Sequence, residues 1–128
     1  MNNFFLLFFL SKVHIQSQES KFYRIWDATK FCPRNELGDY ICNVDISNYN
    51  SRYKFSEDGT VTIYEGKLNN YKVSERKFMV NNDKLILKVG KYETRSSFIF
   101  EFAANENVLF LTIPTDKNYG RIYLKKRI

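Results

Sequence analysis

The sequence predicts an all-β protein, an antiparallel up-and-down β-barrel of about eight strands. Three observations carry this prediction. Apolar and polar residues alternate in short runs from Tyr53 onward, turn residues separate the runs, and no long segment has a helical period. Strict alternation places one side of each strand against a core. A sheet with many short strands must close or stack to bury that side, and short hairpin links favour an up-and-down barrel.

Residues 1–17 differ from the rest of the chain because Phe4 to Leu10 is an unbroken apolar run. This run is shorter than the roughly 20 residues that span a bilayer, and it falls at the lower limit of about 7–15 residues for the apolar part of a secretory signal. Ile15 and Ser17 suit the −3 and −1 positions of a cleavage site. We therefore predict a signal peptide over 1–17, with no stable membrane span. The alternative is a hydrophobic N-terminal strand or anchor.

This interpretation makes 18–128 the barrel domain of an exported protein, either periplasmic or secreted. The chain has two cysteines, Cys32 and Cys42. In an exported protein they are the natural pair for one disulfide, whereas in the cytosol both would be free buried thiols. Two thiols with no histidine nearby make a poor metal site, so we expect no metal and no cofactor.

Residues 18–46 hold two predicted strands. Lys21–Trp26 is the first, with Phe22 or Tyr23 and Trp26 available to a core. Residues 27–39 contain Pro, Gly and Asp and are predicted to be irregular. Tyr40–Ile46 is the second predicted strand, because its apolar residues alternate.

The clearest hairpin joins Arg52–Ser56 to Thr60–Glu65. Its link ends in Gly59, which can supply the positive φ that such a turn needs. Further short runs with alternating apolar residues follow, each bounded by turn residues. These predicted strands are Tyr71–Val73, Lys77–Val80, Lys84–Val89, Ser96–Phe102, Val108–Ile113 and Arg121–Lys125.

Several of these segments, in their order and spacing, resemble the small bacterial lipocalin-like domains, which are often exported. The segments are Arg24–Trp26, Tyr53–Thr60, Tyr71–Val73, Asn82–Leu87, Asn107–Thr112 and Ile122–Lys126. The chain departs from the family pattern at Arg24, where the usual Gly-x-Trp arrangement has glycine. The resemblance implies an antiparallel barrel and a small apolar ligand, although many such domains have no known ligand.

A binding role is the functional prediction. The residues that would face a ligand inside the barrel are apolar or aromatic and lie on the inner faces of the predicted strands: Trp26, Tyr53, Phe55, Phe98, Phe100 and Leu109. An eight-stranded barrel can hold one small ligand or be filled by side chains, and these residues are large enough to fill it. A pocket is expected near one mouth, roofed by Cys32–Asp39.

Enzyme activity is not expected, and no catalytic residue is proposed. The only histidine is His14, which lies in the predicted leader. Without it the mature domain lacks the usual general base and any nucleophile system built on histidine. Glu57 and Asp58 lie in a turn, which adjacent acids commonly favour. Glu101 is expected to face solvent opposite the row of phenylalanines.

The net charge of +6 and the pI of about 9.3 permit attraction to an acidic partner. Most basic residues alternate with apolar ones, as on a solvated outer face. The alternative function is therefore a periplasmic or secreted protein-interaction or inhibitor module without a ligand cavity. A nucleic-acid-binding barrel fits less well, because the aromatic residues are needed in the core and export would separate the protein from nucleic acid. We expect a monomer.

Overall fold

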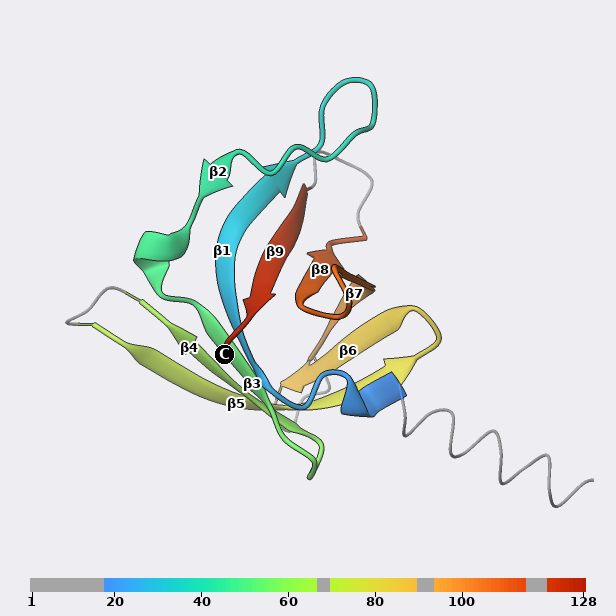
Figure 1. Cartoon of the computed structure of the whole chain (residues 1–128). Coiled ribbons are helices and arrows are strands. Elements are labelled where there is room, and N and C mark those ends of the chain that lie inside the picture. Colours follow the sequence, from blue (N-terminus) through green and yellow to red (C-terminus); the bar gives the residue numbers. More distant parts are fainter. Residues whose placement is uncertain (1–17, 67–69, 90–93, 115–119) are drawn as a thin grey trace, which may run out of the picture.

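A computed structural model of the chain describes residues 18–66, 70–89, 94–114 and 120–128 (Figure 1). The predicted leader 1–17, including His14, lies outside the described residues. A short 3-10 helix, η1 (Ser47–Tyr49), follows the second of nine strands. The strands are β1 (Ile25–Pro33), β2 (Val44–Asp45), β3 (Arg52–Phe55), β4 (Thr60–Glu65), β5 (Lys72–Asn81), β6 (Lys84–Val89), β7 (Thr94–Ala103), β8 (Val108–Thr112) and β9 (Gly120–Lys126).

The strands form a closed antiparallel β-barrel of eight strands with β2 as one extra strand, which confirms the predicted fold class. From β3 to β9 each strand pairs with the next along the chain. β1 closes the barrel, because it pairs with β3 through Trp26 and Tyr53 and with β9 through Trp26 and Lys126. Figure 1 shows β1 and β9 side by side at this seam.

The core follows the alternation of the strands. Its buried members include Phe55, Val61, Ile63, Leu85, Leu87, Leu109 and Leu111, which occupy alternate positions along their strands. Tyr53, Phe98 and Phe100 are partly buried and pack against this core. The Glu101 side chain is 65% exposed, as expected for the outward position beside Phe100. Alternation therefore assigned the two faces of the sheet correctly.

The position of the first strand was predicted wrongly. β1 begins at Ile25 and runs through most of the segment predicted to be irregular. The polar residues of this segment show no apolar alternation, so the sequence does not indicate a strand there. Its backbone N–H and C=O groups are nevertheless paired, with β9 on one side and with β2 and β3 on the other. The pairing with β9 shifts between Ala28 and Lys30, so one residue bulges out of the ladder.

The predicted strand Tyr40–Ile46 is also wrong for most of its length. Only Val44 and Asp45 pair with β1. The predicted Cys32–Cys42 disulfide is present and ties the preceding loop to β1. Within that loop, the Asn35 side chain accepts hydrogen bonds from the backbone N–H groups of Leu37 and Asp39, both 2.9 Å long. The hydrogen bonds of Asn35 hold the loop over residues 35–39, and the disulfide ties Cys42, which was expected in a strand, to β1.

Two predicted short strands, Tyr71–Val73 and Lys77–Val80, belong to the single strand β5. The residues between them are polar, and the sequence there has no apolar alternation. They nevertheless pair with β4, with Ser74 opposite Ile63 and Arg76 opposite Val61. Partner strands thus override a weak local pattern.

Candidate ligand-binding site

One end of the barrel is filled by aromatic side chains. Before β1 the chain forms a turn, in which Phe22 N–H donates to the carbonyl of Glu19. This turn directs Phe22 into the barrel, where it is fully buried. The centre of its ring lies 5.0–6.4 Å from the ring centres of four others: Phe55, Phe78, Phe100 and Phe102. The Trp26 indole N–H donates to the Phe22 carbonyl over 3.1 Å, so the tryptophan fixes the turn in place.

The six residues predicted to meet a ligand fall into two groups. Trp26, Phe55 and Phe100 belong to the aromatic cluster or contact its rings, and Leu109 is fully buried opposite Phe102. Those four side chains fill the same end of the barrel as Phe22, which we call the closed end. Tyr53 precedes Phe55 by two positions and Phe98 precedes Phe100 by two, so both lie on the inner face but nearer the other end.

An open depression of about 450 Å³ lies beside Phe98. The β7–β8 ladder begins at the pair Ile99 and Thr112, so the two chains separate on the side of Phe98 and Ile113. The depression, which we call the mouth depression, is lined by Ser96, Ser97, Phe98, Ile113 and Pro114. Its lining is mainly apolar, with two hydroxyl groups at one side. Of these described lining residues, none comes from the predicted roof Cys32–Asp39.

Tyr53 and Arg76 place polar groups on the inner face of β3 and β5. Burial raises the pKa of the Tyr53 hydroxyl, the Glu65 carboxylate raises it further, and the Arg76 guanidinium partly offsets both. The Tyr53 hydroxyl therefore stays protonated and can donate a hydrogen bond. Arg76 lies opposite the buried Val61 and is itself half-buried, so it is a charged side chain on the inner face of β5.

Arg76 was not predicted to face inward, and Ile113 was not predicted to line a site. Arg76 precedes the buried Phe78 and Val80 by even steps, and this period of two places it on their face. Ile113 was assigned to a strand but not to the site. Only the separation of β7 from β8 exposes it beside Phe98, and no local pattern predicts where two strands part.

The acidic residues in the β3–β4 turn have a structural explanation. The Asp58 carboxylate accepts hydrogen bonds from the Thr60 hydroxyl and backbone N–H, 2.6 and 3.0 Å long. The hydroxyl bond is the main reason that the pKa of Asp58 is lowered. These bonds hold the turn that Gly59, with φ of 86°, completes. No group of three or more possible metal ligands occurs among the described residues.

In comparisons with known proteins, no family model and no curated protein matches this chain. Across residues 18–66, 70–89, 94–114 and 120–128, no helix has the length and apolar character needed to cross a membrane.

Proposed function

We propose that this protein is an exported, lipocalin-like binding protein that takes a small hydrophobic molecule at the open end of its barrel. The observation that carries the proposal is the mouth depression of about 450 Å³ beside Phe98. Its volume lies within the range of about 300–1,000 Å³ that is typical of small-molecule sites. Its lining is mainly apolar, as such sites usually are.

In this proposal the two ends of the barrel have different roles, since one is filled by side chains and the other binds the ligand. Phe22 and its neighbouring rings fill the closed end, so a ligand would lie across the mouth and not along the barrel axis. Phe98 and Ile113 would contact the apolar part of the ligand. The hydroxyl groups of Ser96 and Ser97 would be available to a polar group of the ligand.

A matched pair of variants tests the site. Phe98→Ser removes an aromatic ring from the mouth depression, whereas Ile99→Ser removes an apolar side chain from the outer face of the same strand. Titration with a fluorescent fatty-acid probe should show binding to the wild type and to Ile99→Ser. Binding to Phe98→Ser should be roughly tenfold weaker, because a buried phenylalanine contributes about 1.5–3 kcal/mol.

Two outcomes would count against this function. One is that the wild type binds no probe and carries no co-purified lipid in a native mass spectrum. The other is that both variants weaken binding equally, which would place the probe elsewhere. Either result would favour the second candidate, an interaction or inhibitor module for an acidic partner. The filled closed end supports that candidate, because side chains already occupy much of the interior.

A further inference from the structure

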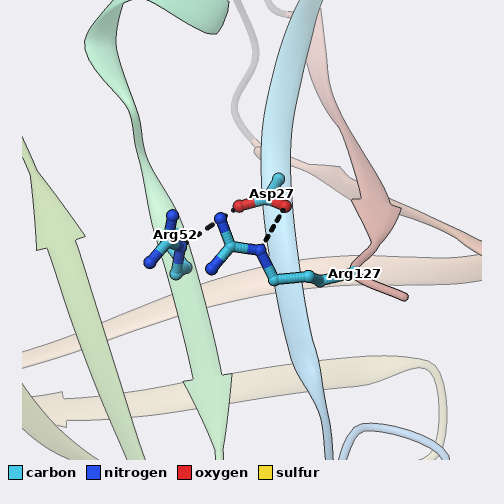
Figure 2. A network of polar contacts seen from close by, with 3 residues as sticks. All are labelled: Asp27, Arg52 and Arg127. Carbon is cyan, nitrogen blue, oxygen red and sulfur yellow. Dashed lines mark hydrogen bonds and ion pairs between the residues drawn. The ribbon is translucent and has the colours of Figure 1, made fainter.

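Three charged side chains meet on the outer wall of the barrel, away from the mouth depression (Figure 2). Asp27 lies on β1 and Arg52 opposite it at the start of β3. Arg127 follows β9, and its backbone N–H donates to the carbonyl of Ile25, which brings it beside β1. The Nε atoms of Arg52 and Arg127 lie 3.2 and 3.3 Å from the two oxygens of the Asp27 carboxylate.

The charges in this cluster do not balance. The Asp27 carboxylate forms ion pairs with two guanidinium groups, and Lys125 lies opposite Asp27 on the same outer face. Three cations therefore face one anion. The Arg52 side chain is 29% exposed and that of Arg127 is 42% exposed, so water and salt screen the charge of Arg52 less than that of a fully exposed side chain. A further anion at this place would relieve that repulsion.

A surface pocket of about 240 Å³ lies at the cluster, and Asp27, Arg52 and Arg127 are part of its wall. Thr29, Asn50 and Ser51 also line it and carry hydroxyl or amide groups that can donate hydrogen bonds. Ser47 lines it too, but its hydroxyl donates to the Asp45 carboxylate over 2.6 Å. The pocket thus combines two guanidinium groups with neutral donors.

We propose that this pocket binds an oxyanion, the phosphate or carboxylate group of a small ligand. Asp27 engages the Nε atom of each arginine and so orients both side chains. The terminal nitrogens of Arg52 and Arg127 then donate to the ligand. Guanidinium groups match the planar or tetrahedral arrangement of such oxygens better than an ammonium group does. Because the pocket lies on the outer wall, it operates independently of the mouth depression.

The probe that tests this proposal is inorganic phosphate, followed through the side-chain Nε–Hε signals of the arginines in NMR spectra. Acetate is titrated in parallel, and sodium chloride at matched ionic strength is the control. The signals of Arg52 and Arg127 are expected to shift saturably with phosphate, acetate or both, and not with chloride. A stronger response to phosphate assigns a phosphate ligand, and a stronger response to acetate assigns a carboxylate.

Variants then connect the binding to these side chains. Arg52→Gln and Arg127→Gln should each weaken binding of the preferred anion about tenfold, since each removes charge-assisted hydrogen bonds. Lys84→Gln makes the same change of charge at an exposed position on β6 and should leave binding unchanged. If Arg52→Gln does not fold, Arg127→Gln near the C-terminus still gives the result. Shifts that chloride reproduces, or an equal loss in Lys84→Gln, would overturn the proposal.

Discussion

At the scale of single residues, Phe22 makes the most aromatic contacts among the described side chains that precede β1. It is fully buried and contacts four aromatic rings, although it lies outside every strand. The chain lacks the glycine that the lipocalin-like pattern places two positions before the tryptophan, and Arg24 stands there instead. The closed end is nevertheless filled, because the turn before Trp26 delivers an aromatic side chain into it.

Replacing Phe22 with alanine is therefore expected to destabilise the fold. Phe22→Ala should lower the free energy of unfolding by about 3–5 kcal/mol, the usual effect of emptying a buried phenylalanine site. Urea denaturation followed by tryptophan fluorescence measures this change, since Trp26 contacts the same cluster. Leu37→Ala is the control, because Leu37 is 87% exposed and its loss should change stability by less than about 0.5 kcal/mol. Similar losses in both variants would show that Phe22 is not a core residue.

At the scale of elements, β1 organises the barrel. It pairs with β9 along most of its length, with β3 at its start and with β2 near its end. The bulge between Ala28 and Lys30 bends β1, so that this one strand can pair with all three partner strands. After β1 the chain makes the loop that Cys32 and Cys42 close, so the disulfide fixes the end of the seam strand.

Removing the disulfide should therefore lower stability. The double variant Cys32→Ala/Cys42→Ala is expected to lose about 3 kcal/mol of unfolding free energy, because a closed loop of this length restricts the unfolded chain. Denaturation with and without a thiol reductant checks the cause. The reductant should reproduce the loss in the wild type and leave the double variant unchanged. A double variant as stable as the oxidised wild type would contradict this role.

At the scale of the whole molecule, the barrel is asymmetric from end to end and from inside to outside. Aromatic side chains fill one end, and the other opens where β7 and β8 part. The inner face is mainly apolar, whereas the outer wall carries the Asp27, Arg52 and Arg127 cluster.

Cleavage of the predicted signal peptide 1–17 would leave a chain that begins at Gln18. Protein recovered from the periplasm or the medium of an expressing culture should have the intact mass of residues 18–128, with one disulfide. Cells treated with an inhibitor of secretion should accumulate the longer chain that keeps residues 1–17. Recovery of only the full-length chain, in the cytosol and with free thiols, would contradict both the leader and the export.

Prediction from the sequence succeeded where a local pattern decides the structure and failed where partners decide it. The hairpin around Gly59 is correct because its turn and alternation are both local. β1 was misplaced because Asp27 to Lys30 carry no apolar alternation, and their pairing with distant strands makes them a strand. Of the proposed site residues, Phe98 lies at the mouth depression, whereas Trp26 and Phe55 belong to the filled end.

The sequence by itself determined that this chain forms antiparallel strands with one apolar face, since a period of two separates the faces without reference to any partner. The two cysteines allowed only one pairing within the chain, and the structure shows that they are bonded. Only the tertiary structure decided which end is filled, where the barrel opens and which charges share Asp27. These features depend on contacts between residues far apart in the chain, and local periodicity carries no information about such distances.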